Sequence, residues 1–151
     1  LGYPVMTGNL TNDNTAANAI TISPAFMIAS QLGVTSSGVG RTTAYTHCQD
    51  YVEVTYRSPN FNGSISGGNY SGGSGISDWV VYSDWRLPTK SEVEIIAQYQ
   101  DADGAVAEVL GGANYYALTG TSTDAVPVPG KTGSSKYIRC VRDVKPGDPN
   151  F

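Results

Sequence analysis

The sequence predicts one α+β domain, because it combines two segments of helical periodicity with one clear strand. Apolar residues recur at helical spacing within Thr42–Val54. Thr89 followed by Glu92 forms the T-x-x-E pattern of a capped helix N-terminus. Lys136–Val144 alternates in the way a strand does. With 151 residues, the chain is long enough to build one core without a metal ion or a dense disulfide network.

The first half of the chain contains further elements. Residues 1–20 are polar and aperiodic, so we expect a loosely held arm or an extended edge, and we assign residues 1–23 to an extended polar arm. The short apolar segment Ala25–Leu32 fits a buried strand, although a buried helical segment fits the same pattern. Ser58–Ser77 contains six glycines among Asn and Ser, which predicts a flexible loop. Asp78–Tyr82 predicts a short strand.

The second half predicts a helix, two strands and their connections. The helix after Thr89 buries Val93 and Ile96 on one face. Further expected segments are one or two helical turns at Ala105–Leu110, a strand at Asn114–Thr119, a loop at Gly120–Ser135 that is too rich in proline for a central strand, and a tail at 145–151. The expected domain therefore covers residues 24–144.

Composition excludes several classes of function. Charged residues make up 15% of the chain and the formal net charge is −4. Nine Lys and Arg residues form no basic stripe, so we expect no nucleic-acid partner. The longest apolar run, Ala25–Ala29, falls far short of the roughly 20 residues that cross a membrane. Because the chain begins at Leu1, we expect a processed protein or an excised domain whose signal or anchor has been removed.

The two cysteines, Cys48 and Cys140, are expected in the core. Cys48 lies on the apolar face of the first predicted helix, and Cys140 shares a strand face with Ile138 and Val144. A disulfide and two buried thiols both fit this placement. With one histidine, the pair cannot form a zinc site of the usual kind. His47 is adjacent to Cys48 on a helix, so the two side chains do not face each other as a catalytic dyad would.

Other candidate groups favour structural roles. Asp78 and Asp84 each precede a tryptophan, and we favour turn-capping carboxylates over a glycosidase pair. Arg86 is expected to be partly buried and bonded to backbone carbonyls or to a carboxylate such as Asp84 or Asp143. Five of the nine basic residues lie within 131–145, where solvated flanks of a strand are favoured over an anionic-glycan patch. The sequence therefore predicts no enzyme, no cofactor and no metal site.

Three motifs together resemble a family of bacterial surface domains. The motifs are Trp85-Arg86-Leu87-Pro88-Thr89-Lys90-Ser91-Glu92-Val93, then Tyr115-Tyr116, and finally Tyr137-Ile138-Arg139-Cys140-Val141-Arg142-Asp143. The family includes the C-terminal domain of the Legionella collagen-like adhesin and the Fibrobacter succinogenes major paralogous domain. The chain is especially similar to C-terminal domains of Bacteroides fimbrillin-type proteins. The resemblance covers roughly residues 24–144.

The resemblance implies a C-type-lectin-like fold, in which two helices flank a small, mainly antiparallel sheet. The strand near 26–32 should then lie beside the strand near 137–144. A disulfide commonly joins the first helix to the last strand in such domains, and Cys48 and Cys140 match these positions. The structural motif would comprise Trp85, Arg86, Leu87, Pro88, Thr89, Glu92, Arg139 and Arg142.

The chain also departs from the family. A Y-W-S strand is usual, whereas Ala117 stands at the Trp position here and Leu118 follows it. The sequence has neither the E-P-N nor the W-N-D signature of calcium-dependent sugar binding; Asp148-Pro149-Asn150 is only a superficial echo. Calcium-dependent sugar binding is therefore not expected.

The family implies an exported, non-enzymatic adhesion domain at the bacterial cell surface, either associated with the outer membrane or fimbrial. Its loops would bind a host glycan or protein. The candidate ligand-binding residues lie in the 112–135 region and are Tyr115, Tyr116, Thr119 and Asp124. The alternative is a structural pilus subunit, or a tip or cap, that joins neighbouring fimbrial subunits by strand addition. The polar arm at the N-terminus motivates this alternative.

Overall fold

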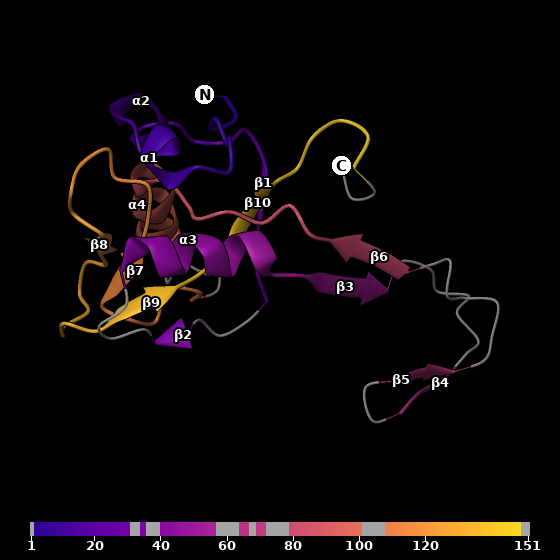
Figure 1. The fold of residues 1–151 in the computed structure, drawn as a ribbon. Coiled ribbons are helices and arrows are strands. Elements are labelled where there is room, and N and C mark those ends of the chain that lie inside the picture. The colour runs from indigo at the N-terminus through magenta and orange to yellow at the C-terminus, as the bar shows by residue number, and fades with distance from the viewer. Residues whose placement is uncertain are drawn as a thin grey trace. The chain divides into compact units, whose positions relative to one another are not determined.

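The computed structural model describes residues 2–30, 34–35, 40–56, 64–66, 69–71, 79–100 and 108–148 (Figure 1). The chain divides into two compact units. The first unit comprises residues 1–51 and 84–151, and the second comprises residues 52–83. Within the described ranges, no helix combines the length and apolar character needed to cross a membrane.

The first unit mixes helices with two small sheets. One sheet has the strand order β2-β9-β7-β8, and the other pairs β1 with β10. The elements are α1 (Leu10–Asp13), α2 (Ala16–Ala19), β1 (Phe26–Ile28), β2 (Val34–Thr35), α3 (Arg41–Asp50), α4 (Lys90–Tyr99), β7 (Asn114–Tyr116), β8 (Ala125–Pro127), β9 (Lys136–Ile138) and β10 (Val141–Asp143).

The expected neighbourhood of the first and last strands is present. β1 pairs antiparallel with β10, and Met27 stands opposite Arg142 in the register (Figure 1). However, the prediction of one continuous strand over 136–144 is wrong. The strand is interrupted at Arg139 and Cys140, because β9 belongs to the four-stranded sheet and β10 pairs with β1. At the start of β10, Val141 exchanges two backbone hydrogen bonds with Arg86, at 2.8 and 2.9 Å.

The N-terminal residues are folded onto the first unit, so the prediction of a loosely held, extended arm is wrong. They form α1 and α2, whose N-caps are Asn9 and Thr15. The carboxylate of Asp13 is buried and accepts a hydrogen bond from the hydroxyl of Tyr45 at 2.6 Å. Side-chain hydrogen bonds, rather than a buried apolar face, fix this segment. Hydrophobic periodicity therefore could not predict its helices.

Helix α3 is shorter than predicted. It ends at Asp50, whereas the periodicity extends to Val54. The backbone is already extended at Tyr51, and a strand begins at Glu53. The buried face of the helix is the predicted one, with Ala44, Tyr45 and Cys48 shielded from solvent.

Helix α4 begins where its sequence predicts. The hydroxyl of Thr89 accepts a hydrogen bond from the backbone N–H of Glu92, and the Glu92 carboxylate accepts one from the backbone N–H of Thr89. This is a complete capping box. Val93 and Ile96 pack with Tyr115 in the main apolar cluster, whose other buried members are Leu110, Ala117, Val126 and Val128.

Two segments of the second half differ from their prediction. Within the loop predicted at Gly120–Ser135, β8 lies at the edge of its sheet, where a strand tolerates Pro127. The predicted turns at Ala105–Leu110 lie outside the described residues as far as 107, and the described remainder is not helical.

Within its described residues, the second unit contains two antiparallel strand pairs. β3 (Glu53–Tyr56) pairs antiparallel with β6 (Trp79–Tyr82), and β4 (Ser64–Ser66) pairs antiparallel with β5 (Asn69–Ser71). The second pair lies within the loop predicted at Ser58–Ser77. The rest of that predicted loop lies outside the described residues.

Candidate functional site

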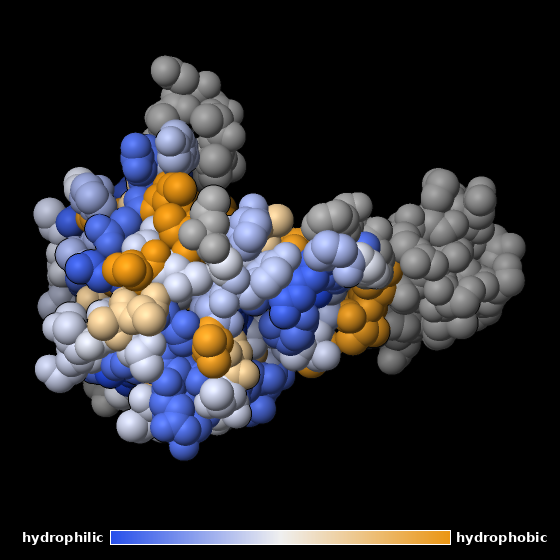
Figure 2. All heavy atoms as spheres, turned by 90° about the horizontal axis from the view of Figure 1, so that it is seen from above, coloured by the Kyte–Doolittle hydropathy of each residue, from blue (hydrophilic) through white to orange (hydrophobic). Residues whose placement is uncertain are grey.

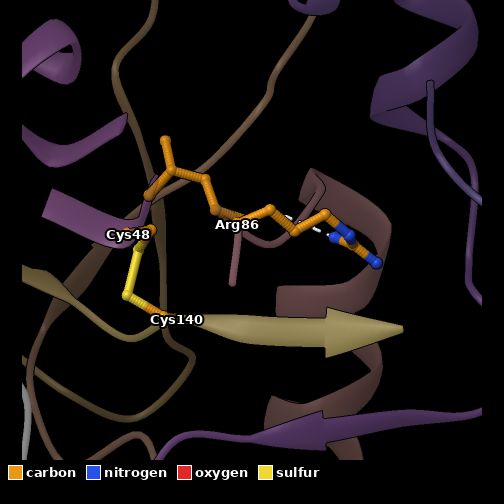
Figure 3. The surroundings of a disulfide bond; sticks show 4 residues. Cys48, Arg86 and Cys140 are labelled. Atoms are coloured by element: carbon orange, nitrogen blue, oxygen red, sulfur yellow. Dashed lines mark hydrogen bonds between the residues drawn. A yellow bond between two sulfur atoms is a disulfide. The ribbon is translucent and has the colours of Figure 1, made fainter. Parts of the chain in front are cut away.

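The two cysteines form a disulfide, as the resemblance implies. The bond joins the last turn of α3 to the residue just before β10, with a Cα–Cα distance of 5.5 Å (Figure 3). Both Cys48 and Cys140 are fully buried. Arg86 lies nearby in the same view (Figure 3). The bridge is a structural cross-link of the core, because buried disulfides of this kind are inert towards solution thiols.

Arg86 lies at the centre of a buried charge network. Its guanidinium donates hydrogen bonds to both oxygens of Glu92, at 2.8 and 2.9 Å, and to Asp143 at 2.7 Å. A further bond, at 3.1 Å, reaches the carbonyl of Leu87. Burial alone would lower the pKa of Arg86, but the hydrogen bonds that it donates to its two carboxylate partners, together with their negative charge, outweigh burial and raise that pKa. The expected pairing with Asp143 is present.

Arg142 forms a second network with different carboxylates. It donates to the two oxygens of Asp84, at 2.6 and 3.1 Å, and to Asp148 at 2.7 Å. Asp84 therefore forms an ion pair with an arginine, in line with the structural role favoured for that residue. Asp78 lies outside the described residues. The prediction of solvated strand flanks is wrong for Arg139 and Arg142, which are 8% and 4% exposed. Strand alternation alone could not show that carboxylates from other segments cover the side chain of Arg142.

The two tyrosines predicted to contact a ligand are in the core. Tyr115 is 1% exposed and Tyr116 is fully buried. They lie on β7, whose two edges pair with β9 and β8, and Tyr115 packs with Val93 and Ile96 of α4 in the apolar cluster. Thr119 is also buried, and its hydroxyl donates to the carbonyl of Thr123 at 2.6 Å. Asp124 remains accessible and lies 3.5 Å from the ammonium of Lys136.

The accessible hollow of this region lies between α4 and β8, which are neighbouring elements. It consists of two adjoining parts that share Lys90, Val126 and Pro127, and we call the whole the α4–β8 groove. The first part has a volume of about 310 Å³ and is also lined by Thr119, Thr121, Thr123 and Ala125. The second part has a volume of about 690 Å³ and is also lined by Glu94, Ala97, Gln98 and Pro129.

The threonine-rich end of this groove is held by two side chains from distant segments. The guanidinium of Arg41 donates to the carbonyls of Thr123 and Thr121, at 2.5 and 3.1 Å. The side-chain oxygen of Asn14 accepts hydrogen bonds from the backbone N–H groups of Thr119 and Gly120, both at 2.9 Å. These bonds fix the loop before any ligand arrives. Sequence reasoning missed Arg41 and Asn14, because no local pattern connects them to residues about 80 to 100 positions away.

The chemistry of the groove is that of a binding surface. Its lining combines hydroxyl groups, one glutamine amide, one lysine and one glutamate with the apolar residues Ala97, Ala125, Val126, Pro127 and Pro129. Such a surface suits ligands that carry hydroxyl or amide groups. Among the described residues, no three His, Cys, Asp or Glu side chains gather closely enough to hold a metal ion. Figure 2 shows a face on which hydrophobic residues form separate patches among hydrophilic ones.

Comparison with known proteins finds similarity to one kind of protein. No protein-family model and no solved structure matches the chain. Two curated relatives are each 27% identical to it over 146 residues: the major fimbrium tip subunit FimD of Porphyromonas gingivalis strain ATCC 33277 and FimD of Porphyromonas gingivalis. The match covers 88% of this chain and 20% of each relative. The chain therefore spans about a fifth of the length of these relatives.

Proposed function

We propose that the chain is a non-enzymatic domain of a bacterial fimbrial protein, displayed at the cell surface, with a C-type-lectin-like fold. The similarity to a fimbrium tip subunit over 88% of the chain carries this proposal. The antiparallel pair of β1 and β10 and the bond between Cys48 and Cys140 support the proposed fold.

Immunogold electron microscopy of the source bacterium tests the placement. Antibodies raised against the purified chain should label fimbriae on intact cells, and cells in which the coding sequence is deleted should show no label. Label confined to the cell interior would reject the proposal.

The domain acts, in this proposal, by binding an uncharged polar ligand such as a glycan in the α4–β8 groove. The preorganised loop at residues 119–123 is the observation that supports it, since a loop already ordered by Arg41 and Asn14 loses little conformational entropy on binding. The buried pair Tyr115 and Tyr116 is no part of this surface.

Glycan arrays and arrays of extracellular-matrix proteins test ligand binding. Replacing two accessible groove residues, Gln98→Ala and Thr123→Ala, should weaken any signal at least tenfold, because each change removes a polar contact. Thr43→Ala is the matched control, since Thr43 is exposed on α3 and does not line the groove. An array without signal, or a signal that all three variants retain, would count against the groove.

A second function, the joining of neighbouring fimbrial subunits, is favoured by strand β1, which pairs with β10 on one edge and, among the described residues, with no strand on the other. Deleting residues 1–23 is not a clean test of this function. The deletion would remove Asp13 from Tyr45 and would remove the backbone N–H of Ser23, which Glu92 accepts at 3.0 Å. Loss of assembly would then report loss of folding.

A further inference from the structure

Two opposite charges line the α4–β8 groove on its helical side. Lys90 and Glu94 both line the second part of the groove, and Lys90 also lines the first. They stand four positions apart on α4, so their side chains are neighbours on the helix surface. Both residues are exposed. The groove therefore offers a ligand one cation and one anion, about one helical turn apart.

These two charges do not neutralise each other. Within the described part of the chain, neither Lys90 nor Glu94 forms an ion pair, with the other or with a third residue. Their order along the helix explains this, because a lysine placed four residues before a glutamate is the less favourable orientation for pairing. Both charged groups are therefore left to water or to a ligand.

A neutral ligand with adjacent hydroxyl groups satisfies both charges. An ammonium group only donates hydrogen bonds and a carboxylate only accepts them, whereas a hydroxyl does both. Two adjacent hydroxyls can accept from Lys90 and donate to Glu94 at the same time. A carboxylate on the ligand would be attracted by Lys90 but repelled by Glu94, and an ammonium group would meet the reverse. The charge pair therefore disfavours ligands of either sign.

The two parts of the groove suit consecutive sugar rings. They adjoin at Val126 and Pro127, whose apolar side chains match the C–H face of a ring. The first part adds the hydroxyl groups of Thr121 and Thr123, both of which are exposed. A chain of sugar rings can pass from one part to the other without leaving the groove.

We propose that the α4–β8 groove binds a neutral oligosaccharide of two or more rings, one of which bridges Lys90 and Glu94 through two adjacent hydroxyls. The neighbouring ring lies against the threonine hydroxyls of the first part. The inference deepens and rests on the proposed binding of an uncharged polar ligand in this groove. It adds the chemical class of that ligand and the two residues that select it.

Binding of a short oligosaccharide will be weak, because each sugar hydroxyl gives up water for every bond that it makes to the protein. We expect a Kd of roughly 1 mM for a trisaccharide. The corresponding monosaccharide fills only one part of the groove, so it should bind at least tenfold more weakly.

Nuclear magnetic resonance on the isotopically labelled chain tests the ligand class. The probes are neutral trisaccharides of glucose, galactose, mannose and N-acetylglucosamine, each compared with the trisaccharides of the matching uronic acid and of the matching amino sugar. At least one neutral trisaccharide should shift the amide signals of Gln98, Thr123 and Val126. It should bind at least fivefold more tightly than either charged counterpart.

Exchanging the two charges tests the bridge. Lys90→Met and Glu94→Met each remove one bond and should weaken binding of that neutral trisaccharide at least fivefold. Glu94→Met also removes the repulsion of anions, so binding of the uronic-acid trisaccharide should strengthen at least fivefold. The double variant Lys90→Glu and Glu94→Lys should bind the neutral trisaccharide within threefold of the natural chain, because a pair of hydroxyls can reverse its donor and acceptor.

An ion pair outside the groove supplies the matched control. Lys131 and Glu108 lie 3.0 Å apart and do not line the groove. The double variant Lys131→Glu and Glu108→Lys should leave binding unchanged. The amide spectrum of each variant without ligand checks that the fold is retained.

Three results would overturn the inference while the groove remains a binding site. They are a charged trisaccharide that binds more tightly than its neutral counterpart, a monosaccharide that binds as tightly as the trisaccharide, and an exchanged variant that binds no better than the single variants. If no trisaccharide shifts the groove signals but a matrix protein binds and needs Gln98 and Thr123, the groove function stands and the oligosaccharide class is wrong. If neither kind of ligand binds, both proposals fail.

Discussion

Both carboxylate oxygens of Glu92 accept hydrogen bonds from the guanidinium of Arg86, at 2.8 and 2.9 Å. The same carboxylate also accepts the backbone N–H groups of Thr89 and Ser23. The side chains of Glu92 and Arg86 are 0% and 3% exposed, so this ion pair is desolvated. One carboxylate thereby ties together the segment before α4, the first turn of α4 and the end of the N-terminal segment.

Replacing this carboxylate by an amide should destabilise the domain. Glu92→Gln leaves the buried Arg86 with Asp143 as its remaining carboxylate partner, so we expect a loss of about 3 kcal/mol in the free energy of unfolding. Urea denaturation measures this loss. Glu94→Gln on the exposed side of the same helix is the control and should change stability by no more than about 0.5 kcal/mol. Equal effects of the two substitutions would contradict the network.

Removing the disulfide should lower stability without changing the fold. The bond closes a sequence separation of 92 residues, and the loss of such a cross-link typically costs about 2–5 kcal/mol. The double variant Cys48→Ala and Cys140→Ala should unfold at a lower denaturant concentration, with an unchanged circular dichroism spectrum. Intact mass and peptide mapping under non-reducing conditions check the link itself. Two alkylatable thiols in the native protein would disprove it.

Gly120 should resist replacement more strongly than another glycine of similar backbone conformation. Its φ is +73°, and a Cβ there would lie 2.8 Å from the Cα of Ala16. Gly130 has a φ of +82° with open space around it. Gly130→Ala should therefore cost only the backbone strain, about 1 kcal/mol, and Gly120→Ala at least twice that. Thermal denaturation of both variants measures the difference, and equal losses would rule out the close approach.

The turn after β10 should be sensitive to acid. Hydrogen bonds from the backbone N–H of Lys145 and from Arg142 lower the pKa of Asp148 below its usual value near 3.8. The unfolded chain then binds more protons near pH 4 than the folded chain does, so this contribution to stability is present above that pH. It is lost as the pH falls through the lowered value. Asp148→Asn should thus be less stable than the natural sequence at pH 7, and the gap should narrow as the pH falls below about 4; a pH-independent gap would contradict the assignment.

Local sequence patterns predicted the features that depend on neighbouring residues in the chain. The pair Thr89 and Glu92 predicts the start of α4 because a capping box lies within one helical turn. The apolar face of α3 predicts the burial of Cys48 for the same reason. The placement of both cysteines in the core favoured a contact between Cys48 and Cys140 but left two buried thiols open, and the family resemblance strengthened the disulfide prediction.

The features that the sequence could not predict depend on contacts between residues far apart in the chain. Asp13 is buried because Tyr45 reaches it from α3, and Arg142 is buried because Asp84 and Asp148 meet it from two other segments. Each bond joins residues that no periodic pattern relates. Tyr115 was expected at the surface because aromatic residues suit ligands, yet it is buried in the apolar cluster with Val93 and Ile96 of α4.

The pairing of β1 with β10 has a mechanical consequence. The aromatic ring of Tyr3 lies 4.8 Å from the ammonium of Lys145, so the segment that leads to β1 and the segment that follows β10 lie close together. Tension applied to these two segments would open the ladder one hydrogen bond at a time, from Phe26 and Asp143 towards Cys140. Opening on the side of β10 would then end at Cys140, which the disulfide holds covalently to Cys48. The segment between the two cysteines would not lengthen under load while that bond is intact.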